Sequence, residues 1–257
     1  MRIDKKDILY FALFGAIGIG TCQFAYLFAI SRINVAAAIL LQYLAPSFIV
    51  VYSVIFAKDR LNKPTVFALF GAIVGCYLVV GAYNLQFLAL NLAGVLSGLL
   101  SAITFAWYSI HGEYGMRRYD PWTVLFYAML FAGLIWNIIQ PPFKAFFHPH
   151  TVMEWVLILY VGIMGTLIPF GLYFNGVNLI RSTRASITAT FEPITAGFVS
   201  FFFLGEVLEP LQITGGILVI MSIIILQMRQ EYDKNTPALL RAENKEQRPD
   251  KTHRIFP

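Results

Sequence analysis

Three observations predict that this chain is an all-α integral membrane protein of about eight transmembrane helices. Apolar residues make up 58% of the 257 residues and charged residues only 13%, a balance too apolar for a soluble domain of this length. Uncharged stretches repeatedly reach the length of about 20 residues that a helix needs to cross a bilayer. Backbone amide and carbonyl groups in lipid must form hydrogen bonds within helices or closed β-barrels. These stretches are too long and too uniformly apolar for barrel strands, so they are expected to be helices.

The predicted spans follow one another as far as residue 228. Lys, Arg, Asp and Glu are absent from five stretches, residues 8–31, 33–57, 64–112, 121–143 and 155–180. The third stretch divides into two spans, because Tyr83, Asn84 and Asn91 supply turn-forming residues in its middle. Two further spans are predicted at residues 185–204 and 211–228. These spans add up to eight.

Basic residues fall on alternate connections. Seventeen of the 19 Lys and Arg residues lie in the N-terminal segment, in the second, fourth and sixth connections or after residue 228, whereas the other connections hold only Arg32 and Lys144. Because positive charge stays on the cytoplasmic side of short loops, we expect a multi-pass inner (plasma) membrane protein with both termini in the cytoplasm. This asymmetry explains the net charge of +5 without a nucleic-acid partner. We expect residues 229–257 to form a disordered tail.

Small residues within the spans are interpreted as packing positions. Cys22 and Cys76 fall inside predicted spans, where small apolar packing is a better explanation than a disulfide. The pairs Gly71/Gly75 and Gly94/Gly98 have the small-xxx-small spacing that lets helix backbones approach closely.

An internal repeat is visible when the sequence is shifted by 147 residues against itself. The shift pairs Gly15 with Gly162, Gly18 with Gly165, Tyr26 with Tyr173, Ala38 with Ala185, and Pro46 with Pro193. The counterpart of the first helix is the sixth, five spans later, so the two run in opposite directions and the repeat is inverted. Inverted repeats give secondary carriers two interchangeable states around a midplane site. The fourth and fifth helices have no upstream counterparts, so two N-terminal helices of the first copy are expected to be absent.

Two motifs carry a resemblance to a known family. Residues 36–46 (AAAILLQYLAP) followed by 58–61 (KDRL), and residues 185–194 (ASITATFEPI) followed by 204–206 (LGE), resemble the signatures of the EamA-type drug/metabolite transporters. The resemblance implies ten helices as five plus five, of which this chain holds three plus five. Residues 1–84 would form an incomplete first repeat and residues 92–228 the second.

The resemblance implies a secondary transporter of small polar metabolites, such as amino acids, or of drugs, with efflux as the expected direction. The expected absence of two helices leaves an alternative open, a truncated, non-transporting membrane fragment or accessory subunit. Phosphate loops, zinc-binding spacings and a Gly-x-Ser-x-Gly elbow are absent from the sequence, so we expect neither an enzyme nor a cofactor or metal. The expected partners are the lipid bilayer and a small-molecule substrate, with proton coupling and a homodimer left open.

Glu192 is the acidic residue that lies deep inside a predicted span. A charge at that depth costs about 2.5–3.5 kcal/mol on insertion scales, which requires compensation. Glu192 is therefore either a partner for a proton or a substrate amine, or a protonated side chain that bonds to backbone freed by Pro193.

The other candidate residues lie mostly near two prolines. Pro46 and Pro193 lack the amide that would bond one turn back, so both helices should bend there, as hinges or as static kinks. Near these bends, Gln42, Tyr43, Thr188 and Thr190 could bind a zwitterionic ligand or form interhelical hydrogen bonds. Trp107 is either a cavity wall or an interfacial aromatic residue, and Tyr173 is a further expected substrate contact.

Overall fold

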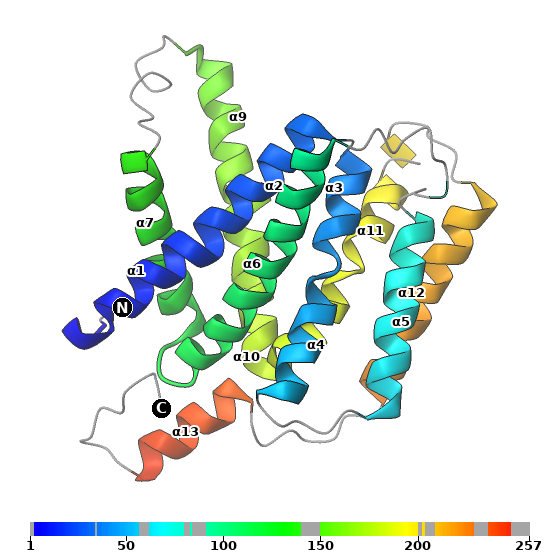
Figure 1. Ribbon diagram of the computed structural model, residues 1–257. Helices are drawn as coiled ribbons and strands as arrows, with labels where there is room; N and C mark the ends of the chain where they lie inside the picture. Colours follow the sequence, from blue (N-terminus) through cyan, green and yellow to red (C-terminus); the bar gives the residue numbers. More distant parts are fainter. Residues whose placement is uncertain are drawn as a thin grey trace. The chain divides into compact units, whose positions relative to one another are not determined.

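The computed structural model describes residues 3–33, 35–56, 62–79, 83, 91–139, 150–199, 202–203, 209–228 and 236–247, and every regular element in these ranges is a helix (Figure 1). The chain divides into two compact units. Unit 1 contains residues 1–20, 111–181 and 234–257, and unit 2 contains residues 21–110 and 182–233. Two long helices, α6 (Leu92–Met116) and α10 (Ile168–Ala189), contribute to both units.

Unit 1 is built around aromatic side chains. Its other elements are η1 (Lys5–Asp7), α1 (Ile8–Leu13), η2 (Phe14–Gly20), α7 (Pro121–Ile139), α9 (Val152–Gly162), η4 (Ile163–Leu167) and α13 (Pro237–Gln247), of which η2 and η4 are π-helices. Tyr10 stacks on Phe14 with ring centroids 5.7 Å apart, and Phe14 meets Phe174 edge to face at 6.2 Å. Both phenylalanines are fully buried, so these rings join the first helix to α10.

Unit 2 is built around small side chains. Its other elements are α2 (Thr21–Arg32), α3 (Val35–Gln42), α4 (Ala45–Ile55), α5 (Lys63–Val79), α11 (Glu192–Val199) and α12 (Pro210–Met228). One buried cluster joins α2 to α3 through Ala29, Ile33, Ala37 and Ala38. The predicted packing role of Gly94 and Gly98 is confirmed, because a Cβ at these positions would touch Ile33 and Leu41 respectively. Cys22 and Cys76 are free and buried, as predicted.

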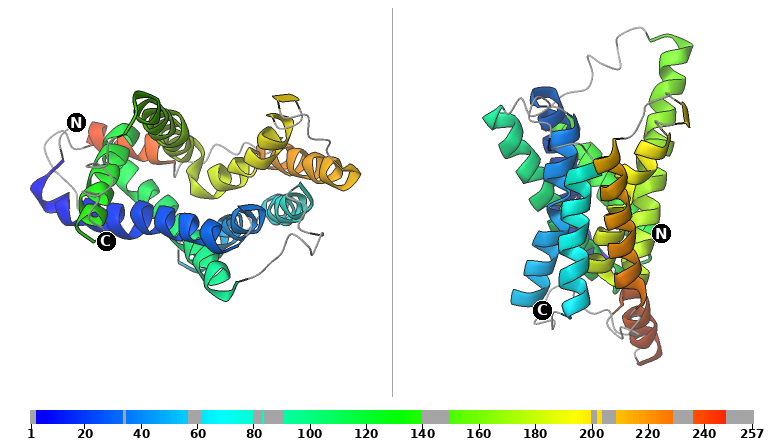
Figure 2. Two further views of the ribbon diagram at one scale, coloured as in Figure 1. Left: turned by 90° about the horizontal axis from the view of Figure 1, so that it is seen from above. Right: turned by 90° about the vertical axis from the view of Figure 1, so that its right-hand side faces the viewer.

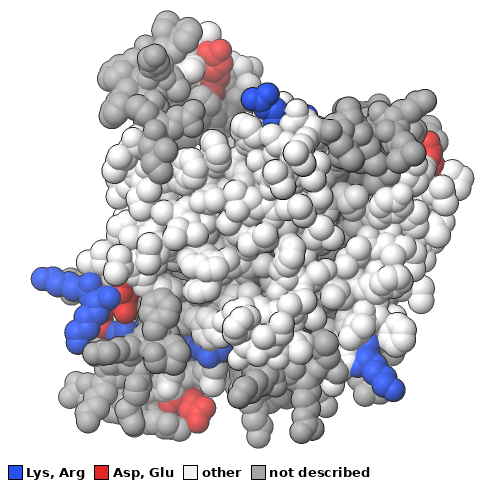
Figure 3. All heavy atoms as spheres, viewed as in Figure 1, with Lys and Arg blue, Asp and Glu red and all other residues white. Residues whose placement is uncertain are grey.

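Five helices in the described part are long and apolar enough to cross a membrane. They are Lys5–Arg32, Ala37–Ile55, Leu92–Met116, Pro121–Ile138 and Val152–Ala189, and the shorter helices Lys63–Val79 and Pro210–Ile225 are also apolar. On the face drawn in Figure 3, most of the surface is uncharged, and the few charged side chains lie near its margins. The total of eight spans stays a prediction.

The predicted division between the third and fourth spans is present. Helix α5 ends at Val79 and α6 begins at Leu92. The Oδ1 atom of Asn91 accepts hydrogen bonds from the amides of Ala93, at 3.0 Å, and Gly94, at 3.3 Å. Asn91 therefore caps α6, whereas Asn84 lies outside the described residues.

We predict that Asn91→Ala lowers the free energy of unfolding by about 1 kcal/mol, because the change leaves first-turn amides of α6 without their acceptor. Thermal unfolding in detergent measures this loss. Asn91→Asp is the matched control, because a carboxylate oxygen can accept the same bonds and should leave stability within about 0.5 kcal/mol of the native protein. Equal losses in both variants would contradict the capping role.

Helices α5 and α12 pack closely side by side and antiparallel (Figures 1 and 2). A Cβ at Gly75 would lie 2.8 Å from the carbonyl oxygen of Gly215, and a Cβ at Gly71 would meet the hydroxyl of Ser222. Farther along, Gln212 donates to the carbonyl oxygen of Val79 at 3.1 Å. The small-residue spacing of Gly71 and Gly75 thus places two helix backbones in contact.

Several elements begin 147 residues apart. Helix α2 begins at Thr21 and α10 at Ile168, α4 at Ala45 and α11 at Glu192, and α5 at Lys63 and α12 at Pro210. The two π-helices follow the same shift, because residues 14–20 correspond to residues 161–167, and η4 occupies 163–167. Within unit 2, helices α5 and α12 run in opposite directions.

Part of the segment predicted to be disordered forms a helix. Helix α13 occupies Pro237–Gln247, and Nη1 of Arg241 donates to the carbonyl oxygens of Met116, at 2.6 Å, and Tyr119, at 3.1 Å, and to Oδ1 of Asn178 at 3.0 Å. Orphan carbonyls after α6 are favourable partners for an arginine. Composition predicts disorder here but does not reveal these distant acceptors, and residues 229–235 and 248–257 lie outside the described residues.

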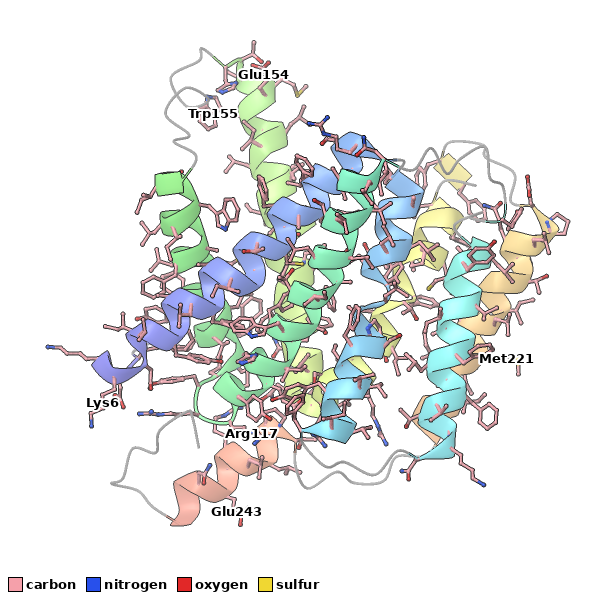
Figure 4. All side chains as sticks on the ribbon, in the orientation of Figure 1. Lys6, Arg117, Glu154, Trp155, Met221 and Glu243 are labelled. Carbon is pink, nitrogen blue, oxygen red and sulfur yellow. The ribbon has the colours of Figure 1, made fainter. Side chains whose placement is uncertain are left out.

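The end of unit 1 that holds the α6–α7 turn is rich in ion pairs. Arg118 pairs with Asp4 and, at 2.7 Å, with Asp7. Tyr119 donates to Oδ2 of Asp7 at 2.5 Å, and burial is the main cause that raises the pKa of its hydroxyl to about 12. The N-terminal segment, the α6–α7 turn and α13 therefore meet at one end of unit 1, the lower end in Figure 4, where Lys6, Arg117 and Glu243 are labelled.

Candidate functional site

Two helices of unit 2 are interrupted next to the two prolines of the repeat. Between α3 and α4, the amide of Leu44 bonds to the carbonyl of Leu41 at 3.1 Å, three residues back. Between α10 and α11, the amide of Phe191 bonds to the carbonyl of Thr188 in the same way, at 3.1 Å. Pro46 and Pro193 follow each break and are buried. The predicted bends are thus present as full interruptions of the helices, and their hinge role stays a prediction.

The two interruptions meet through side chains. The hydroxyl of Tyr43, at the first break, donates to Oε2 of Glu192, at the second, over 3.2 Å. Ten residues after Tyr43, the hydroxyls of Ser53 and Thr183 lie 3.3 Å apart. Because the residue numbers of the partners rise on one segment and fall on the other, the two broken helices run antiparallel.

Glu192 stands at the start of α11, where unpaired amides favour a negative charge. Its side chain is exposed. A carboxylate, the phenol group of Tyr43 and the N-terminal end of a half-helix therefore converge here. Such a group of donors and acceptors can hold a proton or a cationic group of a ligand.

Gln42 belongs to a second polar cluster beside this site. Its Nε2 atom donates to Oγ of Ser101 on α6 at 2.9 Å and lies 3.8 Å from Sγ of Cys22. Cys22 in turn approaches the carbonyl oxygen of Ser101 at 3.5 Å, and Ser101 is fully buried. Sequence analysis missed Ser101 and took Cys22 for packing alone. The sequence feature that could have identified Ser101 and Cys22 is a small polar residue inside an apolar span. Such residues often form hydrogen bonds between packed transmembrane helices.

The remaining candidates are not all brought to this place. The hydroxyl of Thr188 donates to the carbonyl oxygen of Arg184, and that of Thr190 to the carbonyl oxygen of Ile187, so both serve their own helix. Thr190 is also buried, and its carbonyl oxygen lies 4.0 Å from Sγ of Cys76. Trp107 is half-buried on α6 in unit 2, whereas Tyr173 belongs to unit 1 and packs on Phe174.

The side chains at this site can bind a ligand reversibly through hydrogen bonds and charge. Among the described residues, no group of three or more His, Cys, Asp or Glu side chains has the arrangement of a metal site. The fold and the site together define an α-helical integral membrane protein with polar groups gathered at two broken helices. Discontinuous helices with facing half-helix ends are typical of the binding sites of secondary transporters.

The chain belongs to the EamA-like transporter family, whose sequence profile matches residues 1–81 and 92–228. The drug/metabolite transporter resemblance is therefore confirmed, and the chain is an integral membrane protein of a transporter family. The two matched ranges lie close to the predicted repeats, but the motif segments 58–61 and 204–206 lie outside the described residues.

Three curated relatives have similar sequences. The uncharacterized inner membrane transporter YicL of Salmonella typhimurium is 30% identical over 88% of this chain and 75% of its own length. The riboflavin transporter ImpX of Fusobacterium nucleatum is 27% identical over 87% of this chain and 77% of its own. The pseudopaline exporter CntI of Pseudomonas aeruginosa is 26% identical over 78% of this chain and 69% of its own.

A solved structure has a similar fold. A chain described as "Crystal structure of protein" superposes with a TM-score of 0.66 over 84% of this chain and 75% of its own length, at 18% sequence identity. This likeness concerns the fold alone.

Proposed function

We propose that the protein is a secondary transporter that moves a small polar metabolite or a drug by alternating access. The observation that carries the proposal is the hydrogen bond between Tyr43 and Glu192, which joins the interruptions of two antiparallel helices. Transporters use such interruptions to aim unpaired backbone groups and helix ends at a substrate near the middle of the membrane.

The alternating-access part of the proposal is supported by the repeat. Helix starts separated by 147 residues, together with the antiparallel pair α5 and α12, are what an inverted repeat of three helices would produce. In such a carrier, one copy takes the conformation of the other when the protein changes state. Pro46 and Pro193 would then act as the hinges.

The proposed substrate contacts divide into two groups. Tyr43 and Glu192 would bind the cationic part of the substrate or the coupling proton, and Gln42 would bind a polar group through its amide oxygen. Thr188 and Thr190 would contribute hydroxyl oxygens, which can still accept a hydrogen bond while they donate within the helix. Trp107 would add an aromatic contact, and a substrate contact at Tyr173 stays a prediction.

Substrate class and direction are supported by the names of relatives. One is a riboflavin transporter and another a pseudopaline exporter, so related chains handle polar organic molecules, and an outward direction has a precedent. A common side of the membrane for both termini is supported by the contacts that join Asp4, Arg118 and Arg241 to one end of unit 1. The excess of Lys and Arg on the connections of that side favours the cytoplasm. The inner membrane is the proposed location.

The proposal predicts solute uptake by purified protein in liposomes, assayed with labelled amino acids, a nucleoside, riboflavin and a cationic dye. Glu192→Gln should lower the initial rate by about tenfold, the size expected when a hydrogen bond to a charged group is lost. If Glu192 also carries the coupling proton, the variant should lose the pH dependence of uptake. Tyr43→Phe should cause a smaller loss.

The matched control is Glu154→Gln, because Glu154 is an exposed carboxylate at the start of α9 and belongs to unit 1, whereas both interruptions belong to unit 2. Uptake by this variant should stay within about twofold of the native rate. If the native protein moves none of the four solutes above the rate of empty liposomes, the transporter proposal is wrong and the accessory-subunit alternative is favoured.

A further inference from the structure

Helix α13 docks on unit 1 by its first half. Thr236, which precedes the helix, is 7% exposed, and Pro237 is fully buried. Arg241 is half-buried, whereas the next three residues, 242–244, are exposed. Helix α13 belongs to unit 1, although the preceding helix α12 belongs to unit 2. Its own contacts, rather than its neighbours along the chain, therefore hold α13 in place.

One nitrogen atom of Arg241 joins two segments of unit 1. Its Nη1 atom donates to the carbonyl oxygens of Met116, the last residue of α6, and of Tyr119, in the turn that follows. The same atom donates to Oδ1 of Asn178 on α10 at 3.0 Å. The last carbonyl groups of a helix have no partner within that helix, so the guanidinium supplies donors that the end of α6 lacks.

The joined segments lie next to the break in α10. Asn178 stands three residues before Arg181, where the backbone leaves the helical region with φ 67° and ψ 163°. Met116 stands three residues after Glu113, whose Oε1 atom accepts from Nε of Arg181 at 3.0 Å. The end of α6 is thus tied to α10 twice, directly through the ion pair and indirectly through Arg241 of α13.

The second of these ties is the one that can be released. A backbone conformation like that of Arg181 persists only where surrounding contacts hold it, and the ion pair belongs to two long helices. Helix α13, in contrast, has 11 residues, and a helix of that length is marginal in water without tertiary contacts. Docking and helix formation of α13 are therefore coupled, which gives the segment two states.

We propose that α13 is a regulatory strap. In the docked state, Arg241 ties the end of α6 to α10 and keeps the break at Arg181 in the conformation described above. In the undocked state, α13 is unfolded and the residues of α10 beside the break move more freely. Because α10 leads along the chain to the interruption before Glu192, the docked strap slows transport. Only this effect on transport rests on the proposed function.

The first measurement follows docking in the full chain in lipid nanodiscs. Spin labels at Lys6→Cys and Asn244→Cys report the distance between the N-terminal segment and α13, which lie at the same end of unit 1 (Figure 4). Both side chains are exposed, whereas Cys22 and Cys76 are buried and stay unlabelled. We expect one narrow distance distribution for the docked strap and a broad distribution for the undocked strap.

Three variants test the contacts of Arg241. Arg241→Ala removes its hydrogen bonds and should shift the docking equilibrium toward the undocked state by about tenfold or more. Asn178→Leu removes one acceptor and should shift it in the same direction by about threefold, whereas Asn178→Asp makes that bond charge-assisted and should keep or strengthen docking. Lys5→Ala is the matched control, because Lys5 is an exposed basic residue of unit 1, and should keep the native distribution.

Hydrogen exchange in the same variants tests the effect on α10. In Arg241→Ala, peptides that cover residues 175–185 should exchange about tenfold faster than in the native protein, because local opening of the break becomes more frequent. Peptides from α5, which belongs to unit 2, should keep their native rates. The Lys5→Ala control should match the native protein in both regions.

Three results would overturn the proposal. They are a native distance distribution in Arg241→Ala, undocking that leaves exchange of residues 175–185 unchanged, and equal acceleration of exchange in α10 and α5, which would indicate general unfolding.

The uptake assay adds a test of the effect on transport. Arg241→Ala should raise the initial rate of uptake by about threefold, and Lys5→Ala should leave it unchanged. A native rate in a variant whose strap has undocked would contradict the regulatory role. If the native protein moves no solute, the transporter proposal fails, and the exchange rates still decide whether α13 fixes the break in α10.

Discussion

Gly215→Leu is expected to lower the free energy of unfolding by about 3 kcal/mol, near the upper end for an overpacked core. A Cβ at this position would lie 2.7 Å from the carbonyl oxygen of Gly75 and 2.8 Å from the amide nitrogen of Val79. Both atoms belong to the backbone of α5 and cannot move aside as a flexible side chain can. Helices α5 and α12 would therefore separate, at the expense of their van der Waals contacts.

The next residue supplies the control. Gly216 is on the same turn of α12, but among the described residues no atom lies within 4 Å of its built Cβ, so Gly216→Leu should change stability by less than about 1 kcal/mol. Unfolding is followed with a thiol-reactive dye, because Cys22 and Cys76 are free and buried in the native protein. Similar losses in the two leucine variants would disprove close α5–α12 packing.

Glu113→Gln is expected to lower the free energy of unfolding by about 3–5 kcal/mol, the range for breaking a buried ion pair. Oε1 of Glu113 accepts from Nε of Arg181 at 3.0 Å, and the two side chains are only 6% and 15% exposed. Arg181 also interrupts α10 with φ 67° and ψ 163°, the one positive φ found among the described non-glycine residues. Such a conformation costs about 1–3 kcal/mol, so the ion pair holds a strained residue.

A double-mutant cycle with Arg181→Gln tests the pair directly. The combined variant should lose less stability than the sum of the single losses, because each single change leaves one buried charge without the other. Arg117→Gln is the control, since Arg117 meets the same oxygen at 3.6 Å but is 35% exposed, and should cost less than about 1 kcal/mol. Additive losses at Glu113 and Arg181 would contradict the coupling.

Local features of the chain were predicted well because their causes are local. The break between α5 and α6 follows from turn residues, and Asn91 caps α6 through an oxygen three bonds from its own backbone. The interruptions beside Pro46 and Pro193 follow from missing amides. The glycine pairs face neighbouring helices, because a transmembrane helix without small residues cannot approach another closely.

Predictions that required a distant partner were less complete. The polar composition of the C-terminal segment indicated disorder, but Arg241 finds acceptors at Met116 and Asn178, more than 60 positions away. Ser101 was overlooked for the same reason, because its hydroxyl acquires its role only when Gln42 lies beside it. Thr188 and Thr190 were chosen for their hydroxyls, which their own helices use.

The sequence by itself determined that lipid is the solvent of most of the chain. It also predicted where spans begin and break, and that two parts of the chain are related by a shift of 147 residues. Hydropathy, prolines and caps act within a few residues, so they can be read in order along the chain. The tertiary structure decided that Tyr43 meets Glu192 across 149 positions. It also decided that α7 packs on η2, whereas in the described part of the chain no residue of α9 is buried. These contacts depend on which faces pack, and apolar spans with little periodicity do not specify their faces.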